Sequence, residues 1–211
     1  MSRRGRLLPL AALLAATVSL TACDDAPPRP PDPAASELGA VSMDDLRVRL
    51  EGQLADLQLD RVDQARLETE LDALLADPGF RQQAEQLGIR ATGWFRMGEG
   101  GAVIKYAKGR GQVDLEGGRS DLPFTLEAWS VGGMIGGSAS RGYVIVLGLE
   151  REATLPGEYR GEVNSATALT EDTHGPTQLR HAPHGHVVYL LDVATGMSAN
   201  AGVSKVKVSL Q

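Results

Sequence analysis

Residues 124–137 decide the fold class, because the sequence changes pattern halfway along them. In Phe124-Thr125-Leu126-Glu127-Ala128-Trp129 every second residue, from Phe124 on, is apolar, and glycine pairs then dominate Val131-Gly132-Gly133-Met134-Ile135-Gly136-Gly137. Alternation with a period of two is typical of a strand with one buried face. The glycines would destabilise a helix, whereas in a strand they mark a bulge or a sharp bend. We therefore expect a strongly curved, glycine-rich antiparallel sheet or a small β-barrel.

Other segments of the C-terminal half carry strand signals too. Residues 205–210 alternate in the same way, and residues 102–106, 143–149 and 187–191 are more continuously apolar. A continuously apolar strand is predicted to be covered on both faces. Glycines are predicted to punctuate these strands at Gly109-Arg110-Gly111, Gly117-Gly118 and Gly196.

The segment before Gly88 is helical by its period. Ser42, with Asp45 three residues later, is predicted to cap a helix with one apolar face formed by Leu46, Leu50, Leu54 and Leu57. A second helix is predicted from Val62, Leu67, Leu71, Leu74 and Leu75, and a short third one from Asp77-Pro78 to Gly88. The predicted fold class is α+β, a single domain over residues 41–211 with amphipathic helices in 41–88 and a β-rich part in 89–211.

The N-terminus has the pattern of an export signal. Residues 1–22 contain Arg3, Arg4 and Arg6, no acidic residue, and an apolar run that is short for a membrane span. They lead into Leu20-Thr21-Ala22-Cys23, which resembles the bacterial lipobox, where cleavage exposes a cysteine that carries lipid. The alternative is an ordinary signal peptide with a stray cysteine. We predict lipid attachment at Cys23.

The segment that follows Cys23 is predicted to be a tether. Residues 26–35 hold five prolines, which favour an extended spacer, so residues 23–40 would connect the lipid to the domain. The predicted location is the bacterial cell envelope, on a membrane and facing the periplasm. Asp24 resembles an inner-membrane retention signal and slightly favours that membrane.

Composition excludes several classes of protein. The chain has 211 residues, one Cys and a formal charge of -6, so a disulfide framework or a multi-cysteine zinc site is excluded. Four lysines and few aromatic residues argue against a nucleic-acid partner. Residues 24–90 hold 15 acidic and 7 basic side chains, whereas residues 91–211 hold 12 and 11. The acidic helices have either a solvated face or a docking surface for a basic partner.

We find no enzyme signature and predict a chain without catalysis or cofactor. Neither Gly98-Glu99-Gly100 nor Gly109-Arg110-Gly111 has the third glycine of a dinucleotide motif, and no P-loop follows any glycine run. His181, His184 and His186 are weak candidates for a metal site, the alternative being loop histidines. Trp94-Phe95-Arg96 is either an interfacial aromatic contact or, as we favour, a buried strand with a snorkelling arginine.

Several of these segments resemble a known family. Gly93-Trp94-Phe95-Arg96-Met97, then Lys105-Tyr106-Ala107-Lys108-Gly109-Arg110-Gly111, then Trp129-Ser130-Val131-Gly132 before Ile135-Gly136-Gly137, are similar to the SYLF lipid-binding domain, over roughly residues 77–210. The chain equally resembles a sister group of small periplasmic barrels implicated in envelope integrity. Glu127-Ala128-Trp129 and residues 170–185 depart from the pattern.

The resemblance implies binding or a structural role. In the matching region, Lys105, Lys108 and Arg110 are the candidates for a lipid headgroup, the alternative being an exposed turn kept soluble by charge. The predicted function is a membrane-anchored envelope lipoprotein with a noncatalytic lipid-binding or envelope-integrity role. The alternative is a structural adaptor that binds an envelope protein through the acidic helices, and the third is a metal-dependent site at the histidines.

Overall fold

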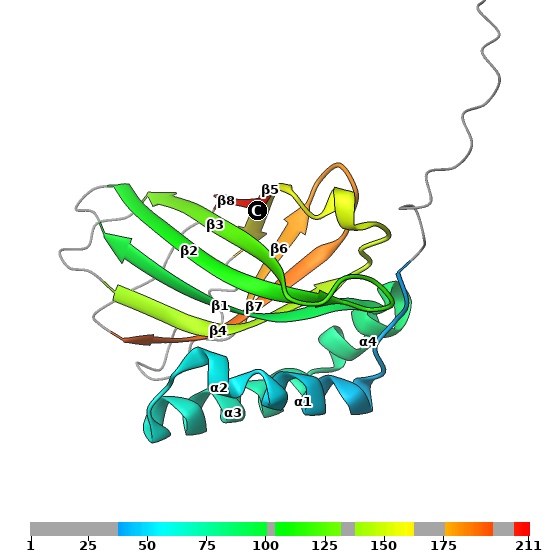
Figure 1. Cartoon of the computed structure of the whole chain (residues 1–211), viewed down its shortest axis with the longest axis horizontal. Coiled ribbons are helices and arrows are strands. Elements are labelled where there is room, and N and C mark those ends of the chain that lie inside the picture. Colours follow the sequence, from blue (N-terminus) through cyan, green and yellow to red (C-terminus); the bar gives the residue numbers. More distant parts are fainter. Residues whose placement is uncertain (1–37, 101–103, 132–137, 163–175, 196–204) are drawn as a thin grey trace, which may run out of the picture. The chain divides into compact units, whose positions relative to one another are not determined.

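The computed structural model describes residues 38–100, 104–131, 138–162, 176–195 and 205–211, all within one unit that spans Ala34–Gln211. Helices come first along the chain and strands follow, and the helices lie together on one side of the sheet (Figure 1). The helices are α1 Met43–Gly52, α2 Leu54–Leu57, α3 Arg61–Ala76 and α4 Pro78–Leu87, with a 3-10 turn η1 at Glu152–Thr154. The strands are β1 Ile89–Gly100, β2 Ile104–Leu115, β3 Leu122–Val131, β4 Ser138–Leu147, β5 Gly157–Glu162, β6 Thr177–His181, β7 Val187–Thr195 and β8 Lys205–Leu210.

The strands close into an antiparallel barrel in the order β1-β2-β3-β8-β5-β6-β7-β4. The fold class is therefore α+β, with the barrel in place of an open curved sheet. The order contains the same unit twice. In each half three consecutive strands form a meander, and the fourth pairs with the first strand of its own half and the third strand of the other half: β4 with β1 and β7, β8 with β5 and β3. Shifting every strand number by four reproduces the order.

Apolar side chains fill the barrel interior, as expected for eight strands. Phe95 and Tyr159 are its largest fully buried members, and Val144, Leu179 and Val208 pack around them. Strand glycines make room for the rings. Phe95 lies between Gly111 of β2 and Gly142 of β4.

These glycines lie against neighbouring main chain. A Cβ on Gly111 would lie 2.1 Å from the carbonyl oxygen of Trp94, and one on Gly142 would lie 1.8 Å from that of Leu191. Neither position admits a side chain, since real Cβ atoms essentially never approach closer than 3.0 Å. Gly109-Arg110-Gly111 therefore lies inside β2 and is not a turn, contrary to prediction, whereas Gly117-Gly118 does lie between β2 and β3.

A second core lies between the helices and the outer faces of β1, β4 and β7. Apolar side chains of the helices, such as Leu46, Leu67, Leu71 and Phe80, pack there against the strand residues Ile89, Tyr143, Ile145, Val187, Tyr189 and Leu191. The predicted double coverage of residues 143–149 and 187–191 is confirmed, because Val144, Val146, Val188 and Leu190 of the same strands face the barrel core. Tyr106, at the end of the third such segment, is 40% exposed, and residues 102–103 lie outside the described ranges.

The helix ends are set by local sequence. Ser42 caps α1 by accepting from the amide of Asp45, as predicted, and Asp77 caps α4 before Pro78. Asp60 caps α3 by accepting from two amides. Two details differ from prediction: the first helix breaks at Gln53 into α1 and α2, and Val62 is 62% exposed.

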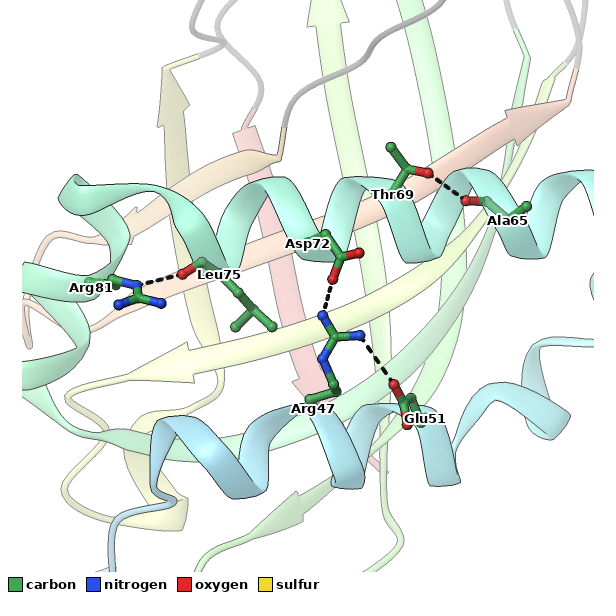
Figure 2. Close-up of polar contacts among 7 residues, drawn as sticks. All are labelled: Arg47, Glu51, Ala65, Thr69, Asp72, Leu75 and Arg81. Carbon is green, nitrogen blue, oxygen red and sulfur yellow. Dashed lines mark hydrogen bonds and ion pairs between the residues drawn. The ribbon is translucent and has the colours of Figure 1, made fainter.

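Polar contacts join the helices to one another (Figure 2). Arg47 of α1 binds Glu51 in its own helix and Asp72 of α3, and its side chain bridges the two helices. Arg81 of α4 donates to the carbonyl oxygen of Leu75 at 2.6 Å. The helical layer is thereby fixed as one unit over a single side of the barrel.

Candidate functional site

One side of the barrel is not covered by the helices. We call the outward side of β2, β3, β8 and β5 the open face. Lys108 and Arg110 of β2, Lys207 of β8 and Glu158 of β5 are exposed there. Because side chains on a strand alternate between the two faces, the open face is defined by residues two apart along each strand. It corresponds, by the repeat in strand order, to the face that the helices cover.

One row of the open face is charge-compensated. Cross-strand pairing places Lys108, Glu127, Lys207 and Glu158 side by side on β2, β3, β8 and β5. The signs alternate along this row, and the Nζ of Lys108 lies 3.8 Å from Oε1 of Glu127. Opposite charges on directly facing positions stabilise a sheet. This row therefore carries no net charge.

In the next row, cations face one another. Pairing places Lys205 of β8 opposite Arg160 of β5, and Arg160 opposite Arg180 of β6. All three side chains are exposed. Like charges on facing positions of a sheet are unfavourable, and Cβ atoms at such positions lie about 5 Å apart. We call Lys205, Arg160 and Arg180 the basic row.

The predicted headgroup residues are not one cluster on a turn. Lys108 and Arg110 are both exposed within β2, and Lys108 is the cation that Glu127 neutralises. Arg110 faces Arg96 of β1 and Thr125 of β3 in the pairing. The side chain of Lys105 lies outside the part of the chain that the structure describes.

The Trp94-Phe95-Arg96 trio is a buried strand, as favoured from the sequence. Phe95 is fully buried in the barrel, and Trp94 packs against the helical core on the other side of β1. The guanidinium of Arg96 lies 5.3 Å from the Trp94 ring centre and donates to the carbonyl oxygen of Asp56 in α2. The trio therefore joins the barrel to the helices.

Three histidines stack at the end of the barrel where β6 turns into β7. The ring centres of His181 and His186 are 4.5 Å apart, and those of His181 and His184 are 5.0 Å apart. His181 and His186 are 4% and 1% exposed, whereas His184 is exposed. We call these three residues the histidine stack. Their spacing in the sequence singled them out as candidates, but the burial of His181 and His186 was not predicted.

Tyr159 of β5 determines which ring nitrogen of His186 carries a proton. Its hydroxyl donates to the carbonyl oxygen of Leu155 at 2.5 Å and lies 2.7 Å from Nε2 of His186. Because a carbonyl oxygen only accepts, the remaining contact requires that His186 donates from Nε2 to the tyrosine oxygen. Burial, together with the neighbouring His181 and His184, lowers the pKa of His186 to about 4. Burial likewise lowers the pKa of His181 and raises that of Tyr159.

The histidine stack lacks the geometry of a metal site. No group of three or more His, Cys, Asp or Glu residues among the described residues is arranged to hold a metal ion. Stacked rings explain this, because the nitrogen lone pairs lie in the ring planes and do not converge on one point. The interplanar angles are 26° for His181 and His186 and 7° for His184 and His186. The fourth histidine of the chain, His174, and two carboxylates close to the histidines in the sequence, Glu171 and Asp172, lie outside the described ranges.

The helices carry an acidic outer surface. In residues 43–87, nine carboxylate side chains are exposed, against three arginines. Part of this charge has a local role, since Asp60 and Asp77 cap helices and Asp72 binds Arg47. Carboxylates such as Asp44 and Glu85 are exposed on α1 and α4.

The predicted lipid attachment site Cys23 and the tether up to residue 37 lie outside the described residues. Among the helices that the structure describes, none has the length and apolarity needed to cross a membrane. Comparison with protein-family models, curated proteins and solved structures gave no significant match.

Proposed function

We propose that this chain is a noncatalytic binding module of the bacterial envelope. Cys23 carries the lipid that holds it on a membrane, with the inner membrane favoured by Asp24, and residues 23–40 tether the domain, which faces the periplasm. Its ligand is anionic phospholipid, in keeping with the resemblance to the SYLF domain. Two acyl chains or more on Cys23 would give the stable attachment that a single chain does not.

The observation that carries this proposal is the contrast between the two sides of the barrel wall. The interior is filled by side chains such as Phe95 and Tyr159, which supports binding on the outside. Outside, the helices cover β1, β4 and β7, and the open face together with the neighbouring strand β6 bears the basic row. The mature chain, counted from Cys23, has a net charge of -9. It can be attracted to an anionic membrane only through a surface on which positive charge is locally in excess, such as the basic row.

Vesicle flotation of the unlipidated chain tests lipid binding. The mature chain with Cys23→Ala would be mixed with vesicles of phosphatidylcholine alone or of phosphatidylcholine with phosphatidylglycerol. We expect recovery only with the anionic vesicles, and less at high salt, because screening shortens the range of surface charges. Equal recovery with both kinds of vesicle would refute headgroup recognition.

The anchor is tested separately in cells. Wild type should fractionate with membranes, and Cys23→Ala should move to the soluble periplasmic fraction, since the acyl chains supply the attachment. If Cys23→Ala remains entirely with the membrane, the anchor assignment is wrong.

A second candidate function is favoured by the acidic surface of the helices, which suits a basic protein partner. Crosslinking and pull-down from intact cells would use two double variants. The first combines Asp44→Asn and Glu85→Gln on the helices. The second, a matched control, combines Asp121→Asn and Glu150→Gln and removes two exposed carboxylates from the barrel. The adaptor function requires that only the first double variant loses the partner that wild type captures. Capture unchanged by either double variant would exclude the helices as the docking surface.

A further inference from the structure

The two halves of the barrel place a pair of cations at matching positions. In the first half a buried aromatic residue, Phe95, precedes Arg96 on β1, and Arg96 pairs with Arg141 on β4. In the second half Tyr159 precedes Arg160 on β5, and Arg160 pairs with Lys205 on β8. The strands of the two pairs correspond in the repeated order, β1 to β5 and β4 to β8.

The first pair shows what such cations bind. Arg96 donates to the carbonyl oxygen of Asp56, and Arg141 donates to that of Gln58 at 2.7 Å. Both acceptors belong to the C-terminal end of α2, where unpaired carbonyl oxygens and the helix dipole give partial negative charge. Two paired cations on the outside of the barrel therefore hold two main-chain carbonyl oxygens of one short segment.

The second pair has the same arrangement without a helix over it. Arg160 and Lys205 are exposed, and Arg180 extends them to a row of three. Two carboxylates of β5 are two residues from Arg160: Glu158, which faces Lys207 in the compensated row, and Glu162, which pairs with Gln178 of β6. Taken together, the two rows have five cations, which are Lys108, Lys207 and the three of the basic row, and two carboxylates, Glu127 and Glu158. The excess of positive charge lies on the basic row.

The surroundings decide which ligand fits. The covered face offers Tyr143, Ile145 and Leu191 to its helices, whereas the open face offers charged side chains such as Lys207 and Glu158, with Tyr106 as an exposed aromatic residue. A helix packed on the open face would bury little apolar surface, and most stabilisation of packed helices comes from such burial. A small, negatively charged group with several oxygen atoms needs no apolar surface.

We infer that Arg160, Lys205 and Arg180 form a binding site for a phosphate group. Guanidinium groups bind phosphate oxygens with paired, charge-assisted hydrogen bonds, and lysine adds a mobile point charge. The phosphate is either that of a phospholipid headgroup, which rests on the proposed function, or that of a soluble phosphorylated compound. Headgroup recognition thus moves from Lys105, Lys108 and Arg110 to residues on three other strands.

The test has one arm for each source of phosphate. In the first, inorganic phosphate is titrated into the unlipidated chain against chloride at matched ionic strength, and backbone amide shifts are followed by NMR. In the second, binding to phosphatidylglycerol vesicles is measured. The double variant that combines Arg160→Gln and Lys205→Gln is compared with a control double variant that combines Arg61→Gln and Arg66→Gln. The control removes two exposed arginines from α3 and changes the net charge equally.

We expect phosphate-specific shifts at residues of β5, β6 and β8 in wild type and in the α3 control, and none in the double variant of the basic row. Vesicle affinity should fall about 30-fold in the latter, since each of the two surface cations is worth about 1 kcal/mol at an anionic membrane. Phosphate shifts without vesicle binding would keep the site, assign it to a soluble ligand and refute the proposed function. Vesicle binding reduced equally in both double variants would keep that function and overturn the site. The absence of phosphate shifts in wild type would also overturn it.

Discussion

Acid should destabilise this domain through the histidine stack. His186 is 1% exposed, donates to Tyr159 and stacks on His181. Protonation would place a charge among apolar side chains and beside two other imidazoles. Among the described residues, no carboxylate contributes to the lowered pKa of His181 or His186, so an imidazolium here would gain no counter-charge from them.

The size and sign of the effect follow from the two pKa values of His186. Its pKa is about 4 in the folded chain and 6.5 at its ordinary value. Between these values the unfolded chain binds a proton that the folded chain does not, so stability is fully present above about pH 6.5 and falls as the pH is lowered to about 4. Because one pKa unit corresponds to about 1.4 kcal/mol, His186 alone removes about 3 kcal/mol. The lowered pKa of His181 acts in the same direction.

Urea unfolding at a series of pH values would measure this loss. Wild type would be compared with His186→Gln, which cannot titrate, and with His184→Gln, which removes the exposed imidazole of the same turn. The carboxylates contribute alike to all three proteins, so the difference between the pH profiles isolates His186. We expect the profile of His186→Gln to be flatter by about 3 kcal/mol between pH 6.5 and 4. Identical profiles for wild type and His186→Gln, or an NMR titration that gives His186 a pKa near 6.5, would refute the reasoning.

Stability measurements on further variants test the packing. Gly142→Ala should cost several kcal/mol and disturb the barrel, because the added Cβ would meet the Leu191 carbonyl oxygen, whereas Gly52→Ala, with nothing within 4 Å, should stabilise α1 by up to about 1 kcal/mol. Leu71→Ala should cost about 2–5 kcal/mol as a buried leucine, whereas Val62→Ala should stay within about 0.5 kcal/mol, since Val62 is exposed. Asp60→Ala should cost about 1 kcal/mol by removing the cap of α3. Urea denaturation would measure the change in the free energy of unfolding for each variant. Equal changes for Gly142→Ala and Gly52→Ala, or for Leu71→Ala and Val62→Ala, would contradict the packing described above.

Much of the helical part could be predicted because its signals are local. The caps at Ser42 and Asp77 act on amides two or three residues away, and Gly88 ends α4 with a positive φ of 73° that glycine adopts readily. The prediction that Val62 lies on the apolar face was wrong, because it counted apolar residues without their angular positions around the helix axis. Leu67, Leu71 and Leu74 define the buried stripe of α3, and a residue five positions before Leu67 lies on the opposite side of the helix.

The closure of the barrel depends on contacts that are distant in sequence. The period of two predicted strands, and the continuous apolar segments 143–149 and 187–191 predicted coverage on both faces. Neither signal shows which strand pairs with which. Gly111 illustrates the limit, since glycine marks both turns and close approaches. Only the neighbouring strand and the Phe124 ring, 2.7 Å from the position of a Cβ, decide that it lies within β2.

The basic row could not be predicted either, because it also depends on strand pairing between residues that are distant in sequence. The candidate residues chosen from the sequence show why. Lys105, Lys108 and Arg110 were grouped because they are close along the chain, but on a sheet the nearest charge is usually on another strand. Glu127, across the β2–β3 pair, neutralises Lys108, whereas Arg160, Arg180 and Lys205 are separated by 20 and 25 residues and meet through pairing. Residues 91–211 carry a net charge of only -1, so a sum over the sequence conceals this separation of charge. The register of the strands, and not the composition, brings these three cations together.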